Sequence, residues 1–279
     1  MSAEILVINL DRADARLRFQ ETQMARLGLA FTRIKAIDGS DISDDFFERM
    51  RATGTRLVLR NEMACMLSHA LCWRRSAEGG VPVIVLEDDT VLDPNFKSIV
   101  EAVSGAIDDP NTIVNFEYRR VQKTLGRKIT DVAGPSFALH RLVSSGGGAA
   151  AYYVGPQAAR ALLAIAERRI IIADSLIDFP LRIKRFQVTP APAAALDSLD
   201  REVNFNVGAF QSTIRPRIGR RRPPSMQSFR ANPLTRLIRL QGNSHRWLRT
   251  LAHLGELDRT SFSLSPALKN YIKEGVPGL

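Results

Sequence analysis

The chain has 279 residues, of which 45% are hydrophobic and 24% are charged, and its net charge is +10. This composition provides for a sizeable buried core and excludes an intrinsically disordered chain. No apolar run approaches the roughly 18 residues that cross a bilayer, and the first residues lack a signal-peptide pattern, so we expect a cytoplasmic protein.

The positive charge is concentrated in one part of the sequence. Residues 201–279 hold 14 of the 39 Lys and Arg residues but only 4 of the 29 Asp and Glu residues. This asymmetry predicts a neutral globular domain over residues 1–200 and a basic, mainly helical extension over residues 201–279. Such an extension is expected to meet an anionic partner, either a membrane surface or nucleic acid.

In chain order, apolar strands alternate with amphipathic helices. Residues 4–10 predict a buried strand, followed by a helix over residues 16–29 that Asp11 is expected to cap. Residues 30–39 predict a second strand that ends in Asp38-Gly39, and the helix after it is stopped by a glycine pair. This alternation predicts an α/β fold with a mainly parallel sheet, which binds ligands beyond the carboxyl ends of its strands.

The later part of the chain is less regular. Residues 123–131 resemble a hairpin or an excursion loop, and Pro156 is expected to open a helix. Gly146 to Gly148 allow the backbone to approach a ligand closely, but they lack the spacing of a nucleotide-binding loop. Residues 188–198 predict an extended closing segment.

Three consecutive carboxylates, Glu87, Asp88 and Asp89, follow the apolar run of residues 83–86. Like charges side by side repel one another, so the cluster needs a cation or hydrogen-bond donors opposite it. On a continuing strand, Glu87 and Asp89 would share one face, where oxygen ligands suit Mg²⁺ or Mn²⁺. The alternative, that the acids cap helices or lie in water, has about equal weight from these residues alone.

One predicted helix places Glu62, Cys65, His69 and either Cys72 or Trp73 on a single stripe. Glu62 and His69 are two turns apart, which is too far to share one metal, but both can line the rim of one cleft. A lone helical histidine is more often structural, and Cys65 is predicted to pack. Cys65 and Cys72 are about 10 Å apart along a helix, too far for a disulfide.

Asp174 and Asp178 follow another apolar run and are four residues apart, so a helix beginning there would place them on one face. Either could act as a general base that removes a proton from an acceptor hydroxyl. The alternative is that Asp174 caps the helix and Asp178 is solvated.

Taken together, these segments resemble the bacterial lipopolysaccharide or lipooligosaccharide glycosyltransferases of family 25, the group that also includes collagen galactosyltransferases. The resemblance rests on six motifs in the family's order: VINLDR (Val7–Arg12), AIDG (Ala36–Gly39), EMACMLSH (Glu62–His69), VLEDD (Val85–Asp89), AAYYVGPQAARALL (Ala150–Leu163) and ADSLI (Ala173–Ile177).

This resemblance implies a GT-A-like, Rossmann-like fold and an inverting, metal-dependent transfer of a hexose, with galactose favoured, from a UDP-sugar. It implies that Glu87 and Asp89 hold Mn²⁺ or Mg²⁺ and that Asp174 is the base, with Asp178 as its rival. The donor-binding residues that it implies are Asn9, Leu10, Asp11, Arg12, Asp38 and Asp88. It also implies that Glu62 and His69 shape the donor or the acceptor side. One departure is Ile172-Ala173-Asp174, where the family commonly has a proline-containing PVD-like start.

The basic extension is divided by an arginine-rich linker over residues 215–224. Residues 233–254 predict two short amphipathic helical segments that suit an anionic membrane surface, unless their apolar face packs on the domain. Nucleic acid is disfavoured because aromatic residues for base stacking are scarce there. We therefore expect peripheral association with the inner face of the cytoplasmic membrane and a lipopolysaccharide, lipooligosaccharide or related glycan as acceptor. The alternative is a catalytically inactive binding module that acts through its basic tail.

Overall fold

The computed structural model describes residues 3–54, 57–120, 123–144, 147–178, 182–203 and 262–278. The strands are β1 (Glu4–Asn9), β2 (Thr32–Lys35), β3 (Val83–Glu87), β4 (Thr90–Leu92), β5 (Thr112–Asn115), β6 (Glu117–Tyr118), β7 (Thr124–Asp131), β8 (Ala138–Ser144), β9 (Ala151–Val154), β10 (Lys184–Thr189) and β11 (Ala193–Ala195). The helices are α1 (Asp14–Leu27), η1 (Gly39–Asp41), α2 (Asp44–Ala52), α3 (Arg60–Gly79), α4 (Phe96–Ala106), α5 (Pro156–Ala166), α6 (Ala173–Ile177), α7 (Leu196–Val203) and α9 (Pro266–Lys273).

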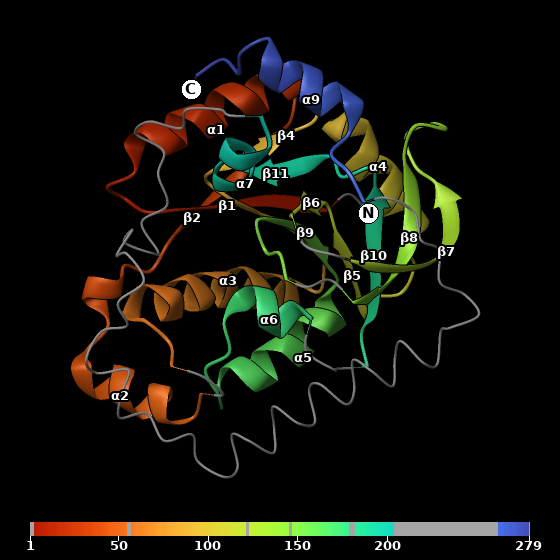
Figure 1. Ribbon diagram of the computed structural model, residues 1–279. Coiled ribbons are helices and arrows are strands. Elements are labelled where there is room, and N and C mark those ends of the chain that lie inside the picture. Colours follow the sequence, from red (N-terminus) through yellow and green to blue (C-terminus); the bar gives the residue numbers. More distant parts are fainter. Residues whose placement is uncertain are drawn as a thin grey trace.

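Within these residues, a large sheet has eight strands in the order β2-β1-β3-β9-β5-β10-β8-β7, and a small one has the order β4-β11-β6. Helices cover both faces of the large sheet. In Figure 1, α3, α5 and α6 lie below it and α1, α4, α7 and α9 lie above it. The molecule is therefore a three-layer α/β structure, as the sequence predicts.

The apolar strand sequences are explained by burial on both faces. In β1, Leu6 and Ile8 pack into the core below the sheet, whereas Ile5 and Val7 pack into the core above it. Strand β3 divides its residues between the two cores in the same way. A strand buried on both faces reads as a continuous apolar run, which is what residues 5–8 and 83–86 show.

The large sheet is mixed, so the prediction of a mainly parallel sheet is wrong. Strand β1 pairs in parallel with β2 and β3, but β9 lies antiparallel between β3 and β5. Residues 124–131 form a single strand, β7, which pairs antiparallel with β8, so the segment interpreted as a hairpin or an excursion loop is one arm of a longer hairpin. The expected helix boundaries at Pro156 and at Gly79-Gly80 are confirmed.

A third apolar cluster joins residues 262–278 to the body of the molecule. Leu264, Leu268 and Ile272 are buried against Phe19 of α1 and Val91 of β4. Ser263 and Ser265 also exchange backbone hydrogen bonds with Ala191, at 2.8 and 3.0 Å. These residues of the predicted extension are thus part of the folded core.

The linker of residues 215–224 and the amphipathic segments of residues 233–254 lie outside the described residues. Within the part of the chain that the structure describes, no helix combines the length and the apolar content needed to cross a bilayer.

Candidate functional site

The carboxyl ends of β1 and β3 bring Asn9 beside the acidic triplet. The two strands are parallel neighbours, with Ile8 in register with Glu87. The Asn9 side-chain amide donates a hydrogen bond to Asp88 Oδ2 at 2.8 Å, and Arg33 of β2 donates to Asn9 Oδ1 at 3.0 Å. Both residues of the Asn9–Asp88 pair are buried. Two predicted site segments that lie far apart in the sequence therefore meet at one edge of the sheet.

The triplet does not continue as a strand, so its expected alternation of faces is wrong. Strand β3 ends at Glu87, and Asp88 and Asp89 form the turn that leads into β4. Asp88 uses both oxygens inside the protein, Oδ2 with Asn9 and Oδ1 with Arg16 at 2.8 Å. Asp88 therefore fixes the turn, which leaves Glu87 and Asp89 as the carboxylates of the triplet that could hold a cation.

Asp89 is buried in a way that calls for a positive partner. Its side chain is 11% exposed, and Oδ1 has no hydrogen-bond partner among the described residues. Burial raises the pKa of Asp89 well above its ordinary value, and the neighbouring charge of Glu87 raises it further, although Arg16 opposes both effects. Asp197, at the start of α7, contributes in the same direction as Glu87. A buried carboxylate oxygen without a donor is suited to binding a cation.

Helix α1 supplies the donors that hold the turn. Arg16 Nη1 lies 2.8 Å from Asp88 Oδ1 and 3.6 Å from Asp89 Oδ2. The buried Gln20 amide donates to the carbonyls of Asp88 and Thr90 at 3.1 and 2.9 Å. Sequence reasoning missed both residues, although Arg16 and Gln20 are polar residues at a helical spacing of four and share one face of α1.

Glu87 is oriented by a chain of hydrogen bonds from below the sheet. His69 of α3 lies between Glu87 and Tyr152 of β9, with Nε2 3.2 Å from Glu87 Oε1 and Nδ1 3.0 Å from Tyr152 Oη. The indole N–H of Trp73 donates to Tyr152 Oη at 2.8 Å. Burial alone would raise the pKa of Glu87, but the hydrogen bond from His69 and the positive charges of Arg119 and Arg16 act together to lower the pKa. Glu87 is therefore kept as a carboxylate.

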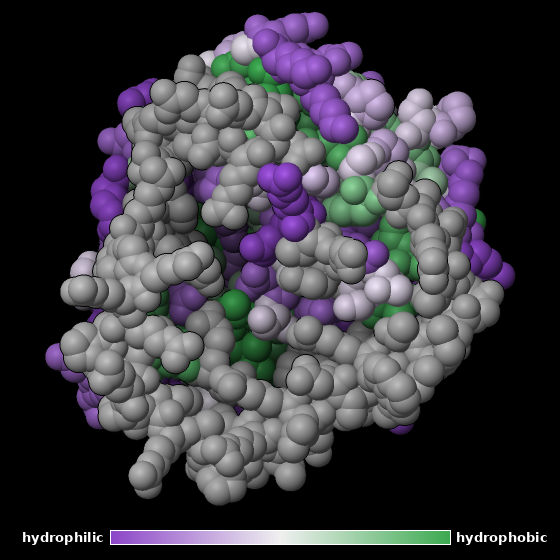
Figure 2. Space-filling view, in the orientation of Figure 1, coloured by the Kyte–Doolittle hydropathy of each residue, from purple (hydrophilic) through white to green (hydrophobic). Residues whose placement is uncertain are grey.

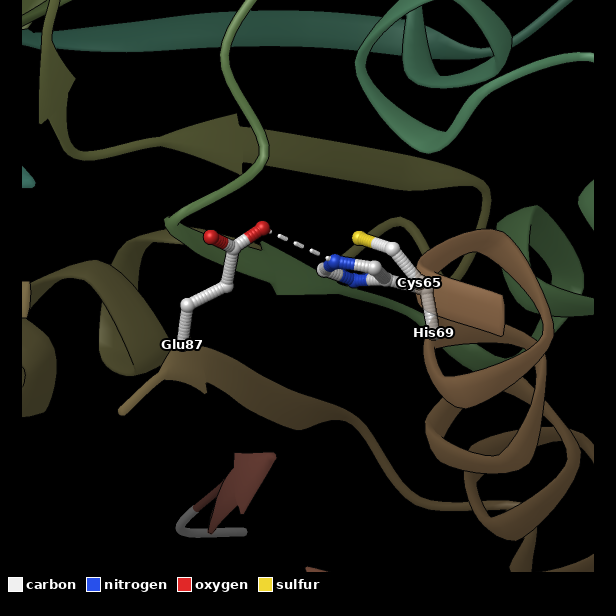
Figure 3. A group of neighbouring side chains, drawn as sticks. All are labelled: Cys65, His69 and Glu87. Carbon is white, nitrogen blue, oxygen red and sulfur yellow. Dashed lines mark hydrogen bonds and ion pairs between the residues drawn. The ribbon is translucent and has the colours of Figure 1, made fainter. Parts of the chain in front are cut away.

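The structure places the other predicted residues of α3 differently. Glu62 accepts the backbone N–H of Leu59 at 2.9 Å and so caps the first turn of α3. His69 is fully buried, whereas a position at the rim was expected. The Cys65 side chain is partly buried, and its sulfur faces His69 and Glu87 (Figure 3). Burial raises the pKa of the Cys65 thiol well above its ordinary value.

The remaining residues of the first motif lie at the ends of β1 and β2. Asp11 does not cap α1, whose first turn is preceded by Ala13; it pairs with Arg33 and Lys35, each at 2.7 Å. Leu10 lies in the turn before α1, where its carbonyl accepts the Ala13 N–H. Arg12 forms an ion pair with Asp38, which also caps η1 through the N–H of Ser40. These two motifs are thus brought together next to Asn9.

The two candidate bases differ in their access to solvent. Asp174 of α6 is 27% exposed and accepts a hydrogen bond from Arg119 at 2.8 Å. Asp178 follows the end of α6 and is 3% exposed. Arg119 was not predicted, because it lies in the irregular segment between β6 and β7 where the sequence shows no period.

The glycine run approaches an internal carboxylate. A Cβ added to Gly148, whose φ is +117°, would lie 2.9 Å from Glu117 Oε2. Glu117 is buried and accepts the Ala150 N–H at 2.8 Å, while the Lys123 ammonium donates to the Glu117 carbonyl at 2.9 Å. Gly148 therefore allows the loop to pass Glu117 closely, which is a structural reason for glycine at this position. In the middle of the face shown in Figure 2, hydrophilic residues lie next to hydrophobic ones.

Comparison with known proteins finds a matching family model and relatives named for the same family. The sequence model of glycosyltransferase family 25, described as LPS biosynthesis protein, matches residues 2–177. A protein of Aedes aegypti named glycosyltransferase 25 family member is 30% identical over 158 residues, which are 48% of this chain and 25% of the relative. A protein of Drosophila pseudoobscura pseudoobscura with the same name is 29% identical over 104 residues, which are 34% of this chain and 17% of the relative. The chain thus spans a quarter or less of these relatives' lengths.

Proposed function

Because this chain belongs to glycosyltransferase family 25, we propose that it transfers a hexose, with galactose favoured, from a UDP-sugar to a hydroxyl group of a surface glycan. A lipopolysaccharide or lipooligosaccharide acceptor is part of the proposal, as is the GT-A type of the α/β fold. The observation that carries it is the buried Asp89 Oδ1, which has no hydrogen-bond partner among the described residues and lies beside Glu87 at the carboxyl ends of the strands. This is the edge where α/β sheets bind ligands.

The side chains at this edge fit a hard divalent cation. Glu87 and Asp89 would hold Mn²⁺ or Mg²⁺, which take oxygen ligands, with Asp197 nearby as a further carboxylate. When bound, such a cation neutralises charge on a diphosphate leaving group. Asp88 and Arg16 keep the turn in place, and Asn9, Asp11, Arg12 and Asp38 would border the nucleotide.

The partial exposure of Asp174 supports it as the general base. A base must reach the acceptor hydroxyl, and Asp174 is accessible while Asp178 is buried. Arg119 holds the Asp174 carboxylate through its 2.8 Å contact and so fixes the direction from which the proton is taken. The proposed reaction is inverting, with the acceptor oxygen attacking the anomeric carbon from the side opposite the leaving UDP.

The experiment measures UDP release from a panel of UDP-sugars by the full chain, with Mn²⁺ or with a chelator. We expect one donor to be hydrolysed or transferred in a metal-dependent way. Asp174→Asn is expected to lower kcat by about 10²–10⁴-fold, the usual contribution of a general base.

Asp178→Asn serves as the comparison and is expected to retain most of the activity, provided that its thermal unfolding matches the wild type. The reverse pattern would make Asp178 the base. Silence of the wild type across the panel, with no UDP binding, would contradict the transferase proposal. It would favour the alternative of a binding module without turnover.

Membrane association through the basic tail belongs to the same proposal, as does a location at the inner face of the cytoplasmic membrane. Its support is the clustering of arginines in the sequence of residues 233–254. Deleting the tail is a poor test, because residues 262–278 pack in the core. We therefore expect that replacing Arg236, Arg239, Arg246 and Arg249 by glutamine weakens binding to anionic vesicles by roughly two to three orders of magnitude, at about 1 kcal/mol per arginine.

Vesicle co-sedimentation measures this, with neutral vesicles as the control. Equal binding of the variant and the wild type to anionic vesicles would contradict the membrane proposal and leave the catalytic one untouched.

A further inference from the structure

Three different ligand atoms converge on one point next to the acidic triplet. A sulfur of Cys65, a nitrogen of His69 and an oxygen of Glu87 all lie within 4.8 Å of one another. Cys65 and His69 are four residues apart on α3, so they share one face of the helix, and Glu87 approaches from the end of β3. Figure 3 shows the sulfur turned toward the same space as the Glu87 carboxylate.

The surroundings of His69 are those of a metal-binding imidazole. A histidine ligand usually has its other ring nitrogen hydrogen-bonded, which fixes the orientation of the ring. Here Nδ1 lies 3.0 Å from Tyr152 Oη, and Tyr152 is held in turn by the Trp73 indole N–H at 2.8 Å. All three rings are fully buried. The ring is therefore fixed with Nε2 directed toward Glu87.

The three residues of this group differ in their exposure to solvent. The Glu87 side chain is 25% exposed and Cys65 is only partly buried, whereas His69 behind them is closed off. Glu87 and Cys65 therefore lie nearer the solvent than the imidazole does.

We propose that Cys65, His69 and Glu87 form a binding site for a thiophilic divalent cation, with Zn²⁺ as the expected ion. A thiolate selects Zn²⁺ over Mn²⁺ or Mg²⁺, which prefer oxygen ligands. Three protein ligands leave a fourth tetrahedral position for water. This site differs from the oxygen site of Glu87 and Asp89 in its sulfur and nitrogen donors, and the two share Glu87.

Sharing Glu87 has a regulatory consequence, and this consequence rests on the proposed function. A Zn²⁺ ion between Cys65 and Glu87 draws that carboxylate away from the Mn²⁺ or Mg²⁺ site, so Zn²⁺ inhibits transfer in competition with the hard cation. Zinc binding itself does not depend on the transfer reaction.

The test titrates the metal-free full chain with Zn²⁺ against a chromogenic chelator and uses Co²⁺ as a spectroscopic probe. We expect one tight site per chain and, with Co²⁺, a thiolate-to-cobalt charge-transfer band. Cys65→Ser should remove the band and weaken Zn²⁺ binding by more than about 100-fold. Cys72→Ser is the matched control, since Cys72 lies on the same helix but is buried in the apolar core, and it should bind as the wild type does.

A second pair of variants tests the ring orientation. Tyr152→Phe removes the partner of His69 and is expected to weaken Zn²⁺ binding by about 10–100-fold. Tyr153→Phe, which faces the other core, should have no effect. If Cys65→Ser fails to fold, His69→Gln is the second variant that lacks one of the three proposed metal ligands.

Equal Zn²⁺ affinity of the wild type, Cys65→Ser and His69→Gln would overturn the inference, as would a cobalt complex without the thiolate band. The Zn²⁺ titration contains no sugar donor, so its result can be interpreted even if the transferase proposal fails. A chain that transfers sugar but binds Zn²⁺ without Cys65 would refute the zinc site alone.

Discussion

Asp89→Asn is expected to lower sugar transfer by about 10²–10³-fold, the usual effect of removing one preorganised electrostatic contact from an active site. The substitution keeps the shape of the side chain but replaces a carboxylate oxygen by an amide group. The loss should appear in kcat/KM for the UDP-sugar and in the affinity for Mn²⁺, measured by metal titration. Asp108→Asn, which changes an exposed carboxylate, is the matched control and should behave as the wild type.

The same substitution should leave the fold at least as stable. The pKa of Asp89 is raised in the folded state, so the native protein keeps the carboxyl proton more readily than the unfolded chain does. The wild type therefore loses stability as the pH rises above the unfolded pKa, whereas asparagine is neutral at every pH. At neutral pH the free energy of unfolding of the variant should equal or exceed that of the wild type. A variant that unfolds more easily would show that Asp89 is structural and not a cation ligand.

Arg16→Met is expected to destabilise the fold by about 3–5 kcal/mol, because it removes the positive partner of a buried ion pair and leaves the carboxylates uncompensated. The Arg16 side chain is 14% exposed and lies against Asp88 and Asp89. The pKa of Asp88 is already raised, chiefly by burial, and Arg16 holds it down. Without Arg16 the two carboxyl groups retain protons to higher pH, so the loss should be larger at mildly alkaline than at mildly acidic pH.

Urea denaturation at two pH values measures this effect. Arg18→Met, on the exposed side of the same helix, is the control and should change the free energy of unfolding by less than about 0.5 kcal/mol. Mn²⁺ should stabilise Arg16→Met more than the wild type, since the ion can replace the lost positive charge. An unfolding free energy equal to the wild type would show that Arg16 does not compensate the triplet.

The sequence predicts the strands that carry the site better than it predicts their order. Residues 5–8 and 83–86 are continuous apolar runs because both faces of β1 and β3 are buried, and the polar residues after them mark the strand ends. The insertion of β9 antiparallel between β3 and β5 left no comparable signal, since β9 is also short and apolar. Strand pairing depends on partners that are distant in the chain.

The parts of the site that sequence reasoning missed are contacts across long separations. Arg16 reaches Asp88 over 72 residues, and Arg119 reaches Asp174 over 55. A helical arginine and an arginine in an irregular segment both read as solvated charges until the fold places them beside a carboxylate. The surroundings of Cys65 were missed for a related reason, because the helical stripe shows that it shares a face with His69 but not that Glu87 faces that stripe.

The packing of residues 262–278 against α1 and β4 determines when, during synthesis, the acidic turn gains its apolar support. Synthesis proceeds from the N-terminus, so the acidic turn of Asp88 and Asp89 emerges long before Leu264, Leu268 and Ile272, which cover Phe19 and Val91. Ser265, which hydrogen-bonds Asp93 just after β4, emerges in the same late stretch. A nascent chain that has reached only residue 261 therefore has every candidate site residue but not the apolar layer behind the turn. The apolar layer behind the site is therefore completed only after residues 262–278 have been synthesised.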